Sequence, residues 1–220
     1  MPAPIIQPGT QEHKHALESF GLTPSIFQDI GARIFGGYSQ ATPNDVQTAA
    51  GTYAYFTAIR ALRDILCPLG WELHREGNIE MVLAASSQFA ITASSGDKNT
   101  GRNEDEPQTR NSKGSQTSEL VFKNRNQTCL FPEMESNQPS YDPDRTPTWF
   151  LLYHVDSDKD EIRMELSLPI DIDVDTLKVN QWKERIILSE VKFDGTPINK
   201  ANQHELYSDF DIEIKRKTNE

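Results

Sequence analysis

Alternating acidic residues and one Glu-x-Lys triplet are the parts of the sequence whose spacing could support chemistry. Asp171, Asp173 and Asp175 alternate with β-branched residues, so in a strand the three carboxylates lie on one side. They could share a divalent cation, or they could keep a sheet edge from pairing with another molecule, which is the commoner use. Further along, Glu190 and Lys192 stand two residues apart in an apolar run and would project from one face of a strand.

This layout of upstream acidic residues and a Glu-x-Lys triplet resembles the PD-(D/E)xK nuclease family. The resemblance covers about twenty residues, from 171 to 192. It implies a Mg²⁺-dependent nuclease in which Asp173 or Asp175 is the first metal ligand and Glu190 the second. Lys192 would be the catalytic amine that positions or deprotonates the nucleophile, while the metal activates water and stabilises the developing charge.

Two glycines spaced as in a phosphate-binding loop follow an apolar stretch. Gly96 and Gly101 have the required interval, but Arg102 and Asn103 stand where the Lys and the Ser or Thr of that loop are needed. No helical pattern follows directly, so no helix N-terminus would face a phosphate. The glycines therefore predict a surface loop.

The carboxylates of residues 156–160 have the one-three-five spacing that opens an EF-hand calcium loop. Glu161 replaces the glycine of that loop and Ser167 replaces its bidentate glutamate. A polar hairpin turn between two strands explains the same residues. The five histidines form no metal-binding spacing, and Cys67 and Cys129 form no CxxC pair, so zinc chemistry has no support either.

Composition narrows the class of protein. The chain has 220 residues, of which 36% are hydrophobic, enough to bury a core without disulfides or metal. No segment approaches the roughly 18 to 20 apolar residues of a membrane span, and no signal sequence opens the chain, so we expect a soluble, cytoplasmic protein without membrane contacts. The net charge of −11 disfavours non-specific nucleic-acid binding. Residues 133–175 contribute most of it, with twelve acidic residues against three basic ones.

Hydrophobic periodicity predicts helices first and strands afterwards. Phe27, Ile30 and Ile34 mark one helix face, and a longer helix is expected from an N-cap at Thr42 to Leu66. Strands are expected at residues 71–76, 79–85, 88–94, 149–155, 162–168, 170–174, 186–193 and 206–214. Because no helix separates the later strands, the pattern predicts an α+β fold with N-terminal helices packed on a mainly antiparallel sheet.

Two polar segments interrupt this scaffold. Residues 96–117 lack Ala, Val, Leu, Ile, Met and aromatic residues, which predicts a neutral, mobile loop insertion, and residues 132–148 form a second loop rich in Pro and Asp. We expect an N-terminal arm at 1–24 and one domain at 25–220. The Glu-x-Lys spelling recurs at 12–14 and 213–215, and no catalytic set is complete. The leading hypothesis is therefore a non-catalytic interaction or regulatory protein that binds a protein partner through its acidic surface and loops, without a cofactor. The Mg²⁺-dependent nuclease is the alternative.

Overall fold

The computed structural model describes residues 2–86, 88–126, 142 and 146–193. The strand expected at 206–214 and most of the loop expected at 132–148 lie outside the described residues. Among the described helices, none combines the length and apolar character needed to cross a membrane.

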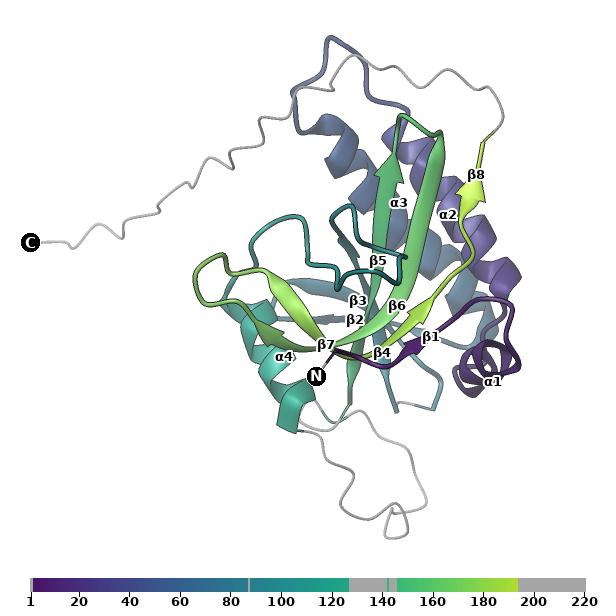
Figure 1. Cartoon of the computed structure of the whole chain (residues 1–220), viewed down its shortest axis with the longest axis vertical. Helices are drawn as coiled ribbons and strands as arrows, with labels where there is room; N and C mark the ends of the chain where they lie inside the picture. Colours follow the sequence, from purple (N-terminus) through teal and green to yellow (C-terminus); the bar gives the residue numbers. More distant parts are fainter. Residues whose placement is uncertain (1, 87, 127–141, 143–145, 194–220) are drawn as a thin grey trace, which may run out of the picture.

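The described chain forms helices packed against one mixed sheet (Figure 1). In chain order the elements are β1 (Ile5–Ile6), α1 (Gln11–Ser19), α2 (Pro24–Tyr38), α3 (Ala49–Leu66), the short 3₁₀ helix η1 (Cys67–Leu69), β2 (Glu72–Glu76), β3 (Ile79–Leu83), β4 (Ala90–Ser95), α4 (Ser115–Asn126), β5 (Thr148–Asp156), β6 (Glu161–Ile172), β7 (Val179–Ile187) and β8 (Val191–Lys192).

Helices α1, α2 and α3 cover one face of the sheet. The predicted stripe Phe27, Ile30 and Ile34 is buried in α2 and joins the core formed with α3 and the sheet. Helix α3 begins at Ala49 with its N-cap at Thr48, six residues later than the expected N-cap at Thr42. The preceding residues form a turn instead, because the carboxylate of Asp45 accepts hydrogen bonds of 2.8 Å from both the backbone N–H and the hydroxyl of Thr42.

The strand order is β1-β7-β6-β5-β4-β3-β2, and β8 pairs with β6. Most neighbours are antiparallel, so the predicted α+β class with a mainly antiparallel sheet is confirmed. Two pairs are parallel, β1 with β7 and β4 with β5. The second pair was not expected. Strands β4 and β5 can run parallel because the connection between them is long and contains the crossover helix α4.

Strand β6 is longer than the sequence pattern predicts. The strands expected at 162–168 and 170–174 form one element that ends at Ile172, and the register with β7 shifts on both sides of Pro169. Proline lacks the N–H that a regular ladder requires, so an irregularity at this position is the usual outcome. Asp173 and Asp175 therefore lie in the turn after the strand, not along one side of it.

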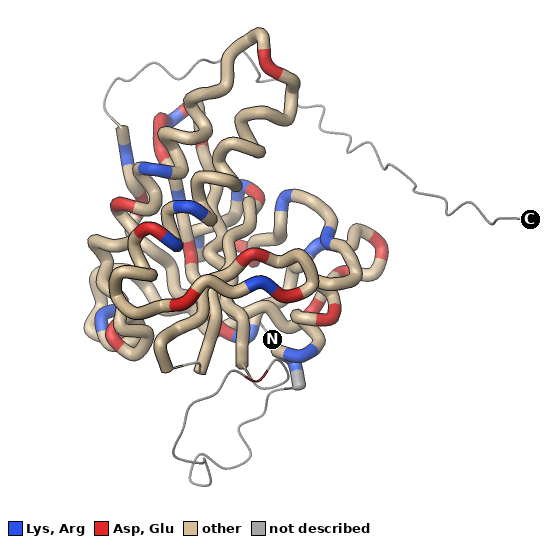
Figure 2. Tube along the Cα trace, turned by 180° about the vertical axis from the view of Figure 1, so that it is seen from behind, with Lys and Arg blue, Asp and Glu red and all other residues tan. Residues whose placement is uncertain are grey.

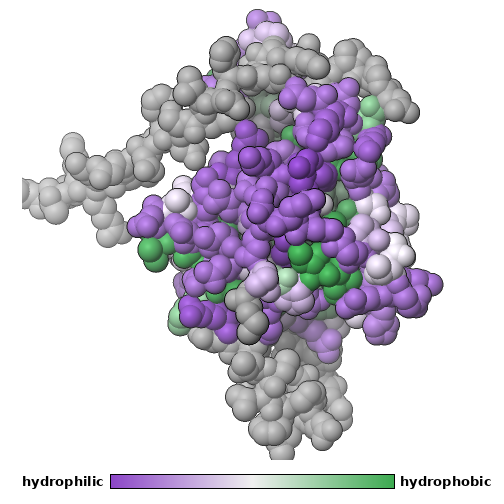
Figure 3. All heavy atoms as spheres, in the orientation of Figure 1, coloured by the Kyte–Doolittle hydropathy of each residue, from purple (hydrophilic) through white to green (hydrophobic). Residues whose placement is uncertain are grey.

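The second face of the sheet is covered by residues 96–113, which we call the covering segment, and by α4. Strands β5 and β6 are consequently buried on both faces over most of their length. Figure 3 shows that this side of the molecule is largely hydrophilic at its surface. The expected loop insertion is confirmed for residues 96–113, whose path is fixed by hydrogen bonds to the sheet. It is wrong for the last three insertion residues, which belong to the helix Ser115–Asn126.

Candidate functional site

The structure does not bring the predicted nuclease residues together. Lys192 pairs with Glu161, the first residue of β6, whereas Asp173 follows Ile172, the last one. A twelve-residue strand is roughly 35 Å long at about 3.3 Å per residue. Asp173 or Asp175 and Glu190 therefore cannot share one Mg²⁺ ion, which corrects the expected site. Within the described ranges, no three His, Cys, Asp or Glu side chains are grouped to hold a metal.

Each of these residues has an ordinary local contact. One carboxylate oxygen of Asp173 accepts hydrogen bonds from the N–H and hydroxyl of Thr176, both 2.8 Å, and from the N–H of Asp175 at 3.1 Å. These bonds, led by the Thr176 N–H, lower the pKa of Asp173. Glu190 and Lys192 form an exposed ion pair with each other. The Asp residues close a turn, and the Glu-x-Lys triplet is a surface pair on a short edge strand.

The described part of the acidic stretch, residue 142 and residues 146–175, does not form one free surface. Glu161 and Glu165 are buried, and Figure 2 shows acidic positions interleaved with basic ones along the described chain. The hairpin turn expected at residues 156–160 is confirmed between β5 and β6. The hypothesis of a protein partner attracted by the acidic surface stays a prediction, and it has less acidic surface to act through than the charge count indicates.

Buried arginines on β6 and β7 fix the covering segment to the sheet. Arg163 donates from Nε to the carbonyl of Thr100 at 3.1 Å and from Nη2 to the carbonyl of Lys98 at 3.0 Å. Its Nη1 bonds to Glu161 at 2.9 Å. Because a guanidinium presents several donors in a fixed plane, one side chain can bind both a carboxylate and two main-chain carbonyls.

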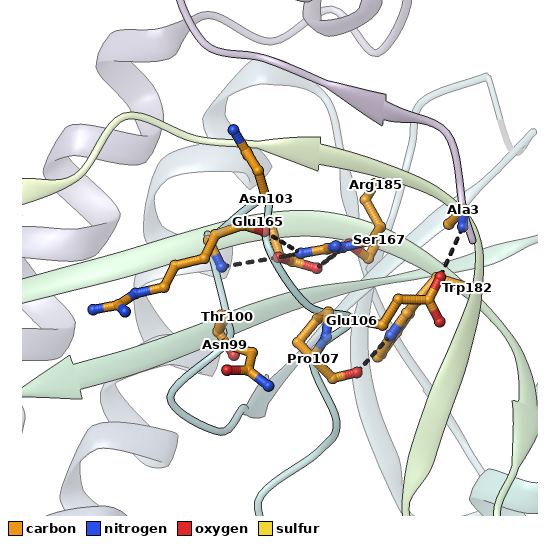
Figure 4. A network of polar contacts seen from close by, with 12 residues as sticks. Ala3, Asn99, Thr100, Asn103, Glu106, Pro107, Glu165, Ser167, Trp182 and Arg185 are labelled. Atoms are coloured by element: carbon orange, nitrogen blue, oxygen red, sulfur yellow. Dashed lines mark hydrogen bonds and ion pairs between the residues drawn. The ribbon is translucent and has the colours of Figure 1, made fainter.

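Arg185 makes the same kind of contact one strand further along (Figure 4). It is fully buried and donates twice to Glu165, at 3.0 and 2.7 Å, and once to the carbonyl of Arg102 at 2.9 Å. Glu165 also accepts bonds from the hydroxyl of Ser167 at 2.7 Å and from the N–H of Gly101 at 2.9 Å. The buried charges are thus paired and hydrogen-bonded, the condition under which buried ions are tolerated.

The two glycines of the segment meet steric demands. Gly101 has φ +70°, and a Cβ there would lie 3.0 Å from the Cβ of Arg163. A Cβ on Gly96 would overlap the hydroxyl of Thr100. The spacing that suggests a phosphate loop is therefore explained by a tight turn pressed against β6, as the surface-loop prediction requires.

A cavity of about 270 Å³ opens at the carboxyl ends of the parallel strands β4 and β5. We call it the α3 pocket, because the first turns of α3 form its other wall. In open α/β sheets, ligands commonly bind outside the carboxyl ends of parallel strands. The lining residues come from α2, α3, both strands and the covering segment: Tyr38, Thr48, Gly51, Thr52, Ala54, Tyr55, Ala93, Ser94, Ser95, Gly96, Arg110, Asn111, Lys113, Tyr153, His154 and Val155.

Lys113 is the most unusual residue of this lining. Its ammonium donates to the hydroxyl of Ser94 at 2.8 Å and forms no ion pair with a carboxylate of the described chain. Burial lowers the pKa of Lys113 to about 8. A desolvated amine whose neighbour is a neutral hydroxyl costs folding free energy, and such arrangements are concentrated at functional sites.

Two further residues of the lining, Tyr153 and His154, are buried or half-buried. Burial lowers the pKa of His154 to about 4, and the nearby charges of Arg163 and Arg110 act in the same direction, so its imidazole is neutral at pH 7. Burial raises the pKa of Tyr153, whose hydroxyl has no hydrogen-bond partner among the described residues. The pocket thus contains a buried polar group that a bound molecule could satisfy.

Comparisons of this chain with protein-family models, with curated proteins and with solved structures found no match. A functional proposal must therefore rest on the residues and geometry of the α3 pocket alone. Sequence reasoning missed it because Lys113 lies in the segment predicted to be mobile, whereas Ser94 ends a strand whose parallel partner was not foreseen. The available signal was the pair of serines, Ser94 and Ser95, at the end of an apolar strand. This pair indicates a pocket only once the parallel pairing of β4 with β5 is known.

Proposed function

We propose that this protein binds a small anionic organic molecule in the α3 pocket. The observation that carries the proposal is the ammonium of the half-buried Lys113, which lies in the pocket wall and is hydrogen-bonded to a neutral hydroxyl. An anionic group in the cavity would supply the counter-charge that this amine lacks in its observed contacts. Charge-assisted hydrogen bonds of this kind are about twice as strong as neutral ones.

The charge of the lining supports the same choice of ligand. In a chain of net charge −11, the described residues around the cavity include Arg110 and Lys113 but no Asp or Glu. The first turns of α3 also line the pocket, and a helix N-terminus favours negative charge. Cationic side chains and the helix dipole therefore act together.

The size and the other lining residues limit the ligand further. A volume of about 270 Å³ equals that of about nine water molecules at roughly 30 Å³ each, so the ligand is a small metabolite and not a polymer. Tyr55, Tyr153 and Val155 offer aromatic and apolar surface for a carbon skeleton. Pockets that combine apolar walls with a few polar groups are typical of small-molecule sites.

Calorimetry with matched charged and neutral probes tests the proposal. Phenyl phosphate and benzoate should bind the protein, whereas benzyl alcohol, of similar size but neutral, should bind at least tenfold more weakly, since a bond to a charged group contributes about 1.5–3 kcal/mol. Lys113→Met should remove most of this preference. Lys14→Met, which deletes an equal charge on the exposed surface of α1, is the matched control. Equal affinity for the charged and neutral probes would refute an anion site.

The protonation state of Lys113 gives a second readout. Because its pKa is about 8, the anion should bind best below pH 8, and its affinity should decline as the pH rises above that value. Other titratable side chains of the lining are Tyr38, Tyr55, Tyr153, His154 and Arg110. His154 is already neutral above pH 5, so it does not contribute to a decline near pH 8.

A further inference from the structure

We infer that Lys113 is a nucleophilic amine that forms an imine with a small anionic aldehyde or ketone, with Ser94 as its proton relay. This inference rests on the proposed anion site and names the chemical class of its ligand. Its geometric basis is the 2.8 Å contact between Nζ of Lys113 and Oγ of Ser94 in the wall of the α3 pocket.

The surroundings of Lys113 favour a reactive amine over a structural one. A structural buried lysine normally pairs with a carboxylate, whereas the described carboxylates form no ion pair with Lys113. Desolvation lowers the pKa of Lys113 to about 8, so about a tenth of the amine is neutral at pH 7. An ordinary lysine with a pKa of about 10.4 is neutral in fewer than about one molecule in a thousand at that pH. Desolvated lysines in pockets are the ones that form Schiff bases with carbonyl compounds.

The position of Ser94 fits the proton transfers that imine formation requires. Neutral Nζ attacks the carbonyl carbon, forming the N–C bond, and the π pair of the carbonyl moves to oxygen. The nitrogen loses a proton to Oγ of Ser94 while the hydroxyl proton of Ser94 passes to the new alkoxide, giving a carbinolamine. The nitrogen lone pair then forms the C=N bond as the carbinolamine hydroxyl leaves, and the remaining N–H proton passes to that hydroxyl to give water. The balance is one amine and one carbonyl to one imine and one water, with no oxidant or reductant.

The rest of the lining would orient the carbonyl compound. Arg110 lines the same cavity, and its charge acts on both Tyr153 and His154 of β5. An oxo acid whose carboxylate faces Arg110 would present its carbonyl to the neighbouring amine. The unpartnered hydroxyl of Tyr153 is a further donor to the carboxylate.

Trapping with glyoxylate and cyanoborohydride tests the inference on the unmodified full chain. Cyanoborohydride reduces an imine to a stable secondary amine, so a lysine that reacts gains one carboxymethyl group, which peptide mapping by mass spectrometry locates. At pH 7, Lys113 should be modified on the order of tenfold faster than the exposed Lys14. The fraction of neutral amine at pH 7 is about a hundredfold higher for Lys113 than for an ordinary exposed lysine. The rate ratio is smaller than this, because an amine with a lower pKa is a weaker nucleophile. Modification of Lys113 no faster than that of Lys14 overturns the inference.

Variants of the two serines that end β4 test the relay. Ser94→Ala should slow trapping of Lys113 by tenfold or more, because general acid–base assistance contributes about 10²–10⁴ in rate. Ser95→Ala is the matched control, since Ser95 lines the pocket but makes no hydrogen bond to Lys113. Equal trapping rates in the Ser94→Ala variant and the unmodified protein remove the relay role.

A neutral aldehyde separates the imine inference from the proposed anion site. Acetaldehyde should modify Lys113 more slowly than glyoxylate does, because it lacks the carboxylate. Equal rates for the two aldehydes, with Lys113 still selectively modified, would refute anion recognition but leave the nucleophilic amine. Binding of phenyl phosphate without any selective trapping of Lys113 would leave the anion site and refute the imine.

Discussion

Replacing Arg185 with methionine should destabilise the protein more than any exposed charge substitution. The guanidinium is fully buried and holds both oxygens of Glu165 as well as the carbonyls of Arg102 and Asp105. Methionine fills part of the volume but donates no hydrogen bond. The carboxylate of Glu165 would remain buried with two neutral donors, the Ser167 hydroxyl and the Gly101 N–H.

The magnitude follows from the broken contacts. Removing one partner of a buried ion pair costs about 3–5 kcal/mol, since the other charge stays desolvated. Each main-chain carbonyl left without its donor adds up to about 1–3 kcal/mol, although such losses are not additive. Small domains unfold with a free energy of about 5–15 kcal/mol, so Arg185→Met should bring this protein close to unfolding at 25 °C. Glu165→Gln in the same variant should recover part of the loss, because it removes the orphaned charge.

Urea denaturation followed by tryptophan fluorescence measures the change in unfolding free energy, and hydrogen exchange reports on the covering segment. Amides between residues 96 and 113 should lose protection in Arg185→Met before the helices do. Lys192→Met is the control, since it breaks an exposed ion pair and should leave the unfolding free energy nearly unchanged. A loss of unfolding free energy below about 1 kcal/mol for Arg185→Met, or unchanged hydrogen exchange in residues 96–113, would refute the conclusion that Arg185 holds the covering segment to the sheet.

Three further predictions concern the same face and pocket. Gly101→Ala should destabilise the protein by about 1–3 kcal/mol, measured by urea denaturation, because φ is +70° and the added Cβ meets β6; Gly114→Ala, with open space around it, should change stability little. His154 has a lowered pKa of about 4, so the unfolded chain binds its proton first; unfolding free energy should fall as the pH falls from 6.5 to 4, and His154→Gln should flatten that slope in thermal melts. Lys113 also binds a proton more weakly in the folded than in the unfolded chain, so the unfolding free energy should rise between pH 8 and 10.5. Lys113→Met should raise the melting temperature at pH 7 and abolish the rise in stability between pH 8 and 10.5. A lower melting temperature of this variant at both pH 7 and pH 10.5 would contradict the prediction.

The sequence predicts the fold class because apolar periodicity and local turn chemistry dominate its helices and hairpins. The stripe of Phe27, Ile30 and Ile34 and the hairpin between β5 and β6 are cases in which nearby residues decide the structure. The start of α3 is not predicted, because the side chain of Asp45 favours a turn over the helix that an N-cap at Thr42 suggests. That competition depends on the geometry of one carboxylate and has no periodic signature.

The covering segment and the pocket could not be predicted because long-range contacts create them. A stretch without apolar residues cannot bury enough surface to order itself, and that reasoning correctly excludes a hydrophobic anchor. It overlooks anchoring by Arg163 and Arg185, whose alternation with apolar residues in β6 and β7 reads as an ordinary solvated strand face. Lys113 acquires its partner, Ser94, only once this segment is in place.

Arg163 and Arg185 bind main-chain carbonyls of the covering segment, so the path of this segment depends little on the side chains that it carries. The side chains of Lys98, Arg102 and Asp105 are exposed, while their carbonyls accept hydrogen bonds from Arg163 or Arg185. Any residue supplies the same carbonyl, so these positions can be varied without altering the path, provided Gly101 is kept. The segment therefore offers a rigid display surface on which new side-chain combinations can be selected while the scaffold beneath stays constant.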